Sequence, residues 1–307
     1  MDILITYQNQ INNYSTESFI KNSFKKLNIN CIFIKTDHLI KNINKYGNYI
    51  CLYNIKNNTD FIKILKKSNL KIYGYTFDLI NYKNLYHEDR QSIMEYNINH
   101  IKTSFIVEDS YNYKNIINKC IHIFQPTKVL PYNITNSISN KIQFIHFGRL
   151  NNSRINKIIK ISETFPNINI YLYGYTESIL VKINRKNIHY KNHKFIEGLE
   201  MYLLTRNNNT FILSFSEIPK ECYYSNRIPM LLGYNALVIQ EKFKNIEKYF
   251  NDREMIIYSN MKELENKVTH MINNFKEQNI LRKNGLECSK KYSFDNYVYT
   301  LIDNLYN

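Results

Sequence analysis

YYSNRIPMLLGYNALVIQ, at residues 223–240, contains a turn, a helix, a second turn and a strand in close succession. Three polar residues at 225–227 lead into an apolar run at helical spacing, and a turn at 233–235 then delivers the chain into the apolar strand 236–239. A helix that begins with serine, asparagine and arginine offers backbone N–H groups, the positive end of its dipole and a guanidinium, which together suit a phosphate or diphosphate. The simpler alternative is an ordinary helix of an α/β domain with a polar cap.

Strand and helix patterns alternate along the rest of the chain. In the first half, apolar strands are expected at 2–7, 31–35, 49–54, 71–77 and 103–108, with helices at 16–27, 38–44, 60–67, 89–97 and 113–119. In the second half, further strands are expected at 143–148, 169–174, 210–216 and 255–259, with helices at 155–164, 198–206 and 261–275. Apolar strands separated by helices predict parallel, doubly wound sheets. The polar, proline-containing segment 129–141 is interpreted as the linker between two such series.

The composition is that of a globular chain. With 307 residues, 44% hydrophobic and 14% aromatic, it has enough apolar side chains for one large or two ordinary domains. Asn, Ile, Lys and Tyr are heavily used whereas Trp is absent. This bias indicates an AT-rich genome, such as that of a large DNA virus or a parasite. Because codon supply alone can place Asn, Lys and Ile, single residues of these types carry little functional weight.

The net charge is +15, from 41 Lys and Arg against 26 Asp and Glu. Such a charge attracts anionic partners, which include nucleotide-sugars, nucleic acid and membrane surfaces. The basic residues are spread along the chain rather than gathered in long runs. A solvated basic surface is therefore the simpler interpretation, and nucleic acid is kept as a less favoured partner.

The five cysteines are odd in number, widely spaced and without any CxxC pair, so neither a disulfide framework nor a zinc site is expected. His189 and His193 have the i, i+4 spacing of metal ligands, but no cysteine or carboxylate motif accompanies them, so no metal is expected either. The thiol pattern favours a reducing, cytoplasmic location. The sequence shows no signal-peptide pattern and no apolar stretch of bilayer length, so a chain without a membrane span is expected.

The segment 225–247, together with MIIYSNMKELENKVTHMI at 255–272, resembles the C-terminal part of GT-B glycosyltransferases, in particular the CgeB-like and group 1 families. In the sequences of those families, an arginine is followed by a helix, a turn of small residues, a strand and a segment that ends near a phenylalanine. A further strand then leads into a helix that begins with a Glu-Leu pair. The residues of this chain that fall in step with that order are Arg227, Asn235, Phe250, Tyr258, Glu263 and Leu264. The resemblance covers most of the second half of the chain. In the first half it is limited to the alternation of strands and helices.

The resemblance implies an α/β fold of two Rossmann-like domains that face each other across a cleft. An N-terminal, acceptor-side domain is expected at 1–138 and a C-terminal domain that binds a nucleotide-sugar at 139–307, with a last helix at about 292–306 crossing back to the first domain. The resemblance also implies a glycosyltransferase that needs no metal or separate cofactor and, like the retaining families, keeps the anomeric configuration. The donor is expected to be a nucleotide-sugar, first of all a UDP-sugar, and the acceptor a glycan, a protein or a small molecule.

FGRLNNSR, at 147–154, follows the first strand of the second series. Gly148, at the end of that strand, lets the backbone approach a ligand, and Arg149 and Arg154 can neutralise a diphosphate. This element resembles the GRLxxxK motif of retaining GT-B enzymes, with Arg149 on its arginine and Arg154 near its lysine. A Gly-Arg turn after a strand is also common without any ligand.

SFSEIPKECYYSNR, at 214–227, lies where the family encloses the donor. With the neighbouring turns, the expected donor contacts are Gly148, Arg154, Gly174, Tyr175, Ser216, Glu217, Tyr224, Ser225, Asn226, Gly233 and Asn235. Gly174 is equally well explained as a plain turn glycine. Two departures from the family pattern concern the helix: Met230 replaces a glutamate that contacts the donor's sugar or ribose, and Gly233 and Asn235 bracket the place of the usual turn glycine. Glu217 either takes over from the missing glutamate or is a solvated loop carboxylate.

Three residues are expected to carry the chemistry. Arg149 and Arg227 would stabilise the leaving nucleoside diphosphate electrostatically, which makes a metal unnecessary. Asp78, just past the strand 71–77, would orient an acceptor hydroxyl or act as a base, although a helix N-cap explains it equally well. Two other classes of function stay open: a catalytically silent sugar-nucleotide or glycan-binding protein, which Met230 favours, and a basic nucleic-acid-binding protein.

Overall fold

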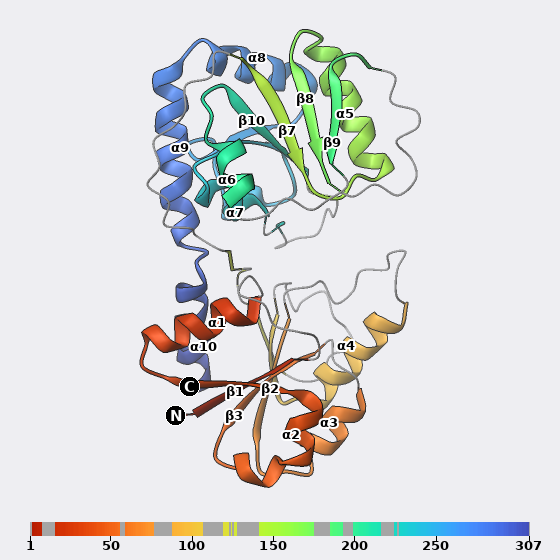
Figure 1. Cartoon of the computed structure of the whole chain (residues 1–307), viewed down its shortest axis with the longest axis vertical. Helices are drawn as coiled ribbons and strands as arrows, with labels where there is room; N and C mark the ends of the chain where they lie inside the picture. The colour runs from red at the N-terminus through yellow and green to blue at the C-terminus, as the bar shows by residue number, and fades with distance from the viewer. Residues whose placement is uncertain are drawn as a thin grey trace. The chain divides into compact units, whose positions relative to one another are not determined.

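The computed structural model describes residues 2–7, 16–55, 59–76, 88–106, 119–122, 124, 126–127, 141–174, 185–192, 199–215, 224–225 and 227–306. They form two compact units (Figure 1). The first unit comprises Met1–Pro126, Glu221–Tyr223 and Ser293–Asn307, and the second comprises Thr127–Lys220 and Tyr224–Tyr292. The expected domain boundary at 138/139 and most of the expected linker lie outside the described residues.

The first unit is built on a parallel sheet in the order β2-β1-β3-β4-β5-β6. Its strands are β1 (Asp2–Tyr7), β2 (Asn30–Lys35), β3 (Ile50–Asn54), β4 (Lys71–Tyr75), β5 (Thr103–Ile106) and β6 (Lys119–His122). Its helical elements are α1 (Thr16–Lys26), α2 (Thr36–Lys41), η1 (Ile43–Tyr46), α3 (Thr59–Leu65), α4 (Glu88–His100) and α10 (Phe294–Tyr306). Because parallel neighbours need crossover connections, helices between the strands cover the sheet and its strands are apolar.

Alternate residues of β1 point to opposite faces of this sheet and divide its core in two. On one face, Leu4 shares a cluster with Ile62 of α3 and Ile98 of α4. On the other face, Ile3 packs in a cluster with Val298 of α10. The last helix therefore completes the core of the unit in which the chain begins.

The second unit repeats the plan with a parallel sheet in the order β12-β11-β10-β7-β8-β9. Its strands are β7 (Gln143–Phe147), β8 (Asn169–Tyr173), β9 (Ile188–Asn192), β10 (Thr210–Ser214), β11 (Leu237–Glu241) and β12 (Ile256–Tyr258). Its helical elements are α5 (Asn152–Thr164), α6 (Leu199–Thr205), α7 (Arg227–Gly233), η4 (Ile246–Lys248), α8 (Met261–Ile272) and α9 (Phe275–Lys290). The predicted α/β fold class of two parallel, helix-flanked sheets is confirmed.

Helices pack against this sheet in two groups. Ile158 of α5 and Val268 of α8 share one cluster with Phe144, Phe211 and Ile239 of the strands. The other group consists of α6, α7 and α9, of which α7 packs against α9 and α6 contacts β10. Figure 1 shows α9 as the long blue helix beside α6 and α7. Residues 227–241 thus fold as predicted into a helix, α7, followed by a turn and a strand, β11.

Besides β6, two of the strands and α-helices were missed from the sequence. The first is the edge strand β9, where apolar residues alternate with histidine, lysine and asparagine. The second is α9, since the helix expected at 261–275 ends at Ile272 and a new helix begins after Asn274. The Asn274 side chain accepts a hydrogen bond from the Glu277 amide (3.3 Å), and Glu277 Oε1 accepts one from Asn274 Nδ2 (2.9 Å). This reciprocal cap is a start signal that the sequence contains. Most of the helix expected at 113–119 lies outside the described residues, and its last residue, Lys119, begins β6.

Within the part of the chain that the structure describes, no helix has the length and apolar character needed to cross a bilayer. Cys31, Cys51, Cys120 and Cys288 are free thiols. Burial raises the pKa of Cys51 to about 12, which makes it an unreactive core residue.

Candidate functional site

The carboxyl ends of β7, β8, β10 and β11 meet at one edge of the second sheet, because all four strands are parallel. Gly148 follows β7, Gly174 follows β8, and Arg227 opens the helix α7 that comes after β10. In open α/β sheets this edge is where ligands bind. The topology therefore brings together residues that the sequence analysis singled out on three separate segments.

Gly148 and Gly174 allow an unusually close approach of their two loops. Gly148 has φ +116°, a conformation that side chains disfavour. A Cβ on Gly174 would lie 1.9 Å from the carbonyl oxygen of Gly148, so any side chain there would push the loops apart. The Gly148 amide also donates a 2.8 Å hydrogen bond to the carbonyl of Tyr173. Both glycines are thus required by the local geometry and are more than ordinary turn residues.

The guanidinium of Arg227 lies directly against Gly148. A Cβ on Gly148 would lie 2.3 Å from Nη2 of Arg227, so the missing side chain leaves room for the arginine. The start of α7 is fixed by Ser225, whose carbonyl accepts from the Ile228 amide (2.9 Å) and whose hydroxyl accepts from the Arg227 amide (3.4 Å). Arg227 is therefore held beside the side-chain-free backbone of Gly148 at the edge of the sheet.

Arg154 supports the loop that carries Arg149. Its amide donates to the side chain of Asn151, the N-cap of α5, at 3.0 Å. Its guanidinium is buried, and Nη1 donates to the carbonyl of Arg149 at 2.6 Å. Arg149 itself is half-buried. Arg154 thus stabilises the Gly-Arg turn through its hydrogen bond to the Arg149 carbonyl. Of the two arginines, Arg149 is the more exposed to solvent.

His146 is a site residue that the sequence analysis missed. Its side chain is 0% exposed, and its Nδ1 donates to the carbonyl of Leu213 on the adjacent strand at 2.9 Å. Burial, together with the positive charges of Arg227 and Arg154, lowers its pKa to about 3. The imidazole is therefore neutral in the physiological pH range. The available signal was a histidine two residues before Gly148, inside an otherwise apolar strand.

Gly233 and Asn235 lie at the other edge of the sheet, because α7 runs away from Arg227 and Asn235 precedes β11. Asn235 has φ 59° and so occupies the left-handed turn position that the resemblance assigns to a glycine. Its carbonyl accepts a hydrogen bond from Nη1 of Arg282. The structure gives both residues a part in the turn and does not bring them together with Arg227.

Tyr224 is buried among aromatic rings, which leaves its ring inside the fold. Met230 is half-buried on α7. The remaining site predictions, which fall outside the described residues, are Asp78, Tyr175, Ser216, Glu217 and Asn226.

The structure describes one member of the histidine pair considered as metal ligands. Nε2 of His189 lies 3.0 Å from Oδ1 of Asn169, whereas His193 is outside the described residues. The described ranges contain no group of three or more His, Cys, Asp or Glu side chains that could hold a metal ion.

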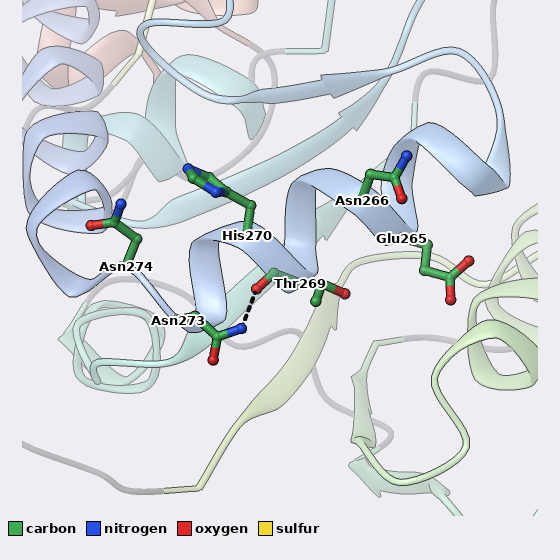
Figure 2. Close-up of a pocket in the computed structure, with 6 residues that line it drawn as sticks. All are labelled: Glu265, Asn266, Thr269, His270, Asn273 and Asn274. Atoms are coloured by element: carbon green, nitrogen blue, oxygen red, sulfur yellow. Dashed lines mark hydrogen bonds between the residues drawn. The ribbon is translucent and has the colours of Figure 1, made fainter.

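A separate hollow of about 590 Å³ lies on α8 and on the turn into α9 (Figure 2). Its polar lining consists of Glu265, Asn266, Thr269, His270, Asn273 and Asn274. Several of these groups bond within the helices: Asn273 Nδ2 donates to the Thr269 carbonyl (3.0 Å), and His270 lies 2.7 Å from Glu277. Because α8 starts near the carboxyl-end edge and these residues occupy its second half, the hollow is distinct from the arginine site.

No protein-family model matches the sequence, and no curated protein sequence matches it. Solved structures do share its fold. HepE of Anabaena, in complex with UDP and glucose, has a TM-score of 0.66 at 10% identity over 99% of each chain. An E. coli trehalose-6-phosphate structure bound with UDP-2-fluoro glucose has a TM-score of 0.70 at 7% identity over 99% of each chain. TarM has a TM-score of 0.63 at 14% identity, with 87% of this chain covering only 57% of TarM.

Proposed function

The chain has the GT-B fold of these structures, and from this premise we propose that it is a glycosyltransferase that moves a sugar from a nucleotide-sugar to an acceptor. A UDP-sugar is the proposed donor, because structurally similar proteins are described in complex with UDP or UDP-glucose. The acceptor is proposed to be a glycan, a protein or a small molecule, and the proposed location is the cytoplasm.

The observation that carries the proposal is the guanidinium of Arg227 placed against the bare backbone of Gly148. A diphosphate needs positive charge and hydrogen-bond donors in a place where no side chain blocks its approach. At the carboxyl-end edge of the sheet, Gly148 and Gly174 are such positions without a side chain, and the Arg227 guanidinium lies beside Gly148. Arg149 adds a second guanidinium on the adjacent turn.

The proposed reaction replaces one bond of the donor sugar by another. The bond between the anomeric carbon and the diphosphate oxygen breaks, and the nucleoside diphosphate leaves with the electron pair. The acceptor oxygen bonds to the anomeric carbon and loses its proton to a base, for which Asp78 is the candidate. Arg149 and Arg227 stabilise the charge that develops on the diphosphate, so the reaction is proposed to need no metal. Retention of the anomeric configuration is proposed from the family resemblance.

Met230 favours one alternative, a sugar-nucleotide-binding protein without catalysis. A thioether on α7 is a weak hydrogen-bond acceptor, so the ribose or sugar contact that a glutamate would make is lost. Met230→Glu is expected to leave the fold intact and to tighten UDP binding by about tenfold, the effect of one added hydrogen bond to a charged group.

Calorimetry with UDP, GDP, ADP and CMP, followed by measurement of the nucleotide released from the matching nucleotide-sugars, tests the proposal. We expect UDP to bind and at least one UDP-sugar to be turned over. Binding of UDP without turnover of any UDP-sugar, with or without sugar acceptors, would contradict the proposal of an enzyme and support that of a binding protein. Absence of binding to every nucleotide, together with salt-sensitive retention on DNA, would favour nucleic acid as the partner.

A further inference from the structure

Aromatic side chains of the second unit form one cluster around Tyr224. The ring of Tyr224 has its centroid 4.9 Å from that of Tyr249, 5.2 Å from that of Phe250 and 5.3 Å from that of Tyr292. Tyr224, Phe250 and Tyr292 are buried, and the Tyr292 hydroxyl donates to the Tyr249 carbonyl at 2.9 Å. Buried aromatic pairs at these distances stabilise their mutual arrangement beyond the area that they bury. The position of the Tyr224 ring is therefore strongly determined.

This ring is only three residues from Arg227. The intervening Ser225 is tied to α7 by two contacts, from the Ile228 amide to its carbonyl and from the Arg227 amide to its hydroxyl. The backbone of Ser225 is thus fixed by the helix on one side and by the anchored ring of Tyr224 on the other. Movement of the ring would displace the first turn of α7, and with it the guanidinium that lies against Gly148.

The same cluster lies where the chain passes between the two units. Three of these passages fall at 126/127, 223/224 and 292/293, and each has a residue of the cluster or a direct neighbour on the side of the second unit. The amide of Thr127 donates to the carbonyl of Tyr292 at 2.7 Å, and Tyr292 packs on Tyr224. The start of α7 is therefore tied to two other segments that are far from it in the sequence.

We propose that Tyr224 is a positioning residue: its ring, held by Tyr249, Phe250 and Tyr292, keeps Arg227 in place for a diphosphate before the ligand arrives. An arginine that is already ordered loses less side-chain and loop entropy on binding, and this increases affinity. The ligand named in this inference rests on the proposed function, whereas the anchoring of α7 rests on the contacts alone.

Amide hydrogen exchange without ligand tests the anchoring. In Tyr224→Leu, we expect the amides of Arg227 and Ile228 to exchange about tenfold faster than in the wild type, as for a segment that opens locally. Tyr224→Phe keeps the ring and should protect these amides as the wild type does. Phe165→Leu is the matched control, because Phe165 is a buried phenylalanine of the same unit at the far end of α5. It should lower the melting temperature without changing exchange at the start of α7.

Calorimetry with UDP on the same proteins tests the effect on binding. Tyr224→Leu should weaken the affinity about tenfold, while Tyr224→Phe and Phe165→Leu should stay within about twofold of the wild type. Unchanged exchange of the Arg227 and Ile228 amides in Tyr224→Leu would overturn the inference, and so would an equal loss of affinity in Phe165→Leu. If the wild type does not bind UDP, the proposed donor is wrong, and the exchange result alone decides whether Tyr224 positions Arg227.

Discussion

The two edges of the second sheet use arginine in different ways. At the amino-end edge, Arg282 is 2% exposed and reaches back from α9 into the fold. Its guanidinium donates to three carbonyls, those of Thr205 (3.2 Å), Asn207 (2.9 Å) and Asn235. Burial lowers its pKa to about 10, so it stays charged at neutral pH. One buried side chain thereby joins the end of α6, the loop before β10 and the turn before β11.

At the carboxyl-end edge, two arginines instead lie around the turn that begins at Gly148. Arg227 lies against the backbone of Gly148, and Arg154 and Arg227 both lower the pKa of His146. Positive charge is concentrated here beside backbone that carries no side chain. The contrast separates two roles of a guanidinium: bonded to carbonyls of several segments, it belongs to the framework, and placed beside a bare glycine turn, it is a candidate for ligand binding.

The largest effect is expected from Arg282→Leu. It leaves one buried and two part-buried carbonyls without their donor, and we expect a loss of about 4 kcal/mol in unfolding free energy, measured by urea unfolding. Lys283→Leu is the control, since this neighbour on α9 is exposed and should change stability by less than about 0.5 kcal/mol. Equal urea midpoints for the two variants would show that Arg282 does not hold the framework together.

Gly174→Ala is expected to have the next largest effect. Its new Cβ would meet backbone atoms of Gly148, which move only if the two loops separate, so we expect a loss of about 3 kcal/mol in stability and no measurable UDP binding. Gly47→Ala provides the matched control, because a Cβ there meets no atom within 4 Å and its φ of −56° suits alanine. That variant should be as stable as the wild type or slightly more stable. A Gly174→Ala protein with wild-type affinity for UDP would place the ligand elsewhere.

The site arginines should affect binding more than stability. Arg149→Ala and Arg227→Ala are each expected to weaken UDP binding by at least about 2 kcal/mol, measured by calorimetry, through loss of a charge-assisted hydrogen bond. Arg185→Ala is the control, because Arg185 is an exposed arginine paired with Glu163. If Arg227→Ala reduced stability as strongly as Arg282→Leu while UDP still bound, the proposed difference between the two edges would be wrong.

The sequence was sufficient for the fold where the core is simple. Buried strands such as β10 and β11 are continuous apolar runs, and these runs with intervening helices predicted both parallel sheets. It was insufficient for α9, whose buried face includes Gln278, Arg282 and Ser289. A helix that buries polar residues has weak hydrophobic periodicity, and its partners, distant carbonyls, are not visible in the sequence.

The site was predictable to the extent that strand ends can be identified. Gly148, Arg149 and Arg227 follow from the rule that ligands bind at the carboxyl ends of parallel strands. Their direct contact does not follow, because it depends on the φ of Gly148 and on the path of α7. His146 was not predicted, because a single histidine in an apolar strand does not indicate which residues of other segments lie next to it. For Gly233 and Asn235, proximity in sequence to Arg227 was misleading, since one helix length carries them to the opposite edge.

Counted per pH unit, the smallest effect is expected from the protonation of His146. The folded protein takes up a proton on this imidazole only near pH 3, whereas the unfolded chain does so near the ordinary pKa of 6.5. Between these values the unfolded state binds more protons, so stability falls as the pH is lowered from 6.5 towards 3 and gains nothing above 6.5. The slope contributed by this one group approaches about 1.4 kcal/mol per pH unit.

His146→Gln removes this contribution, because glutamine does not titrate and can still donate a hydrogen bond to the Leu213 carbonyl. Urea unfolding at pH 7.5, 6.5, 5.5 and 4.5 should give a variant that is less stable than the wild type at pH 7.5 but loses stability more slowly as the pH falls. His189→Gln serves as the control, since His189 is half-buried and pairs with Asn169 at the sheet edge. Parallel curves for the wild type and His146→Gln would mean that the folded protein takes up this proton near pH 6.5, as the unfolded chain does. At low pH, Arg154 and Arg227 would then face a third positive charge. The carboxyl-end edge would need an anion to remain folded. Added UDP or inorganic pyrophosphate would therefore stabilise the protein more at low pH than at pH 7.5.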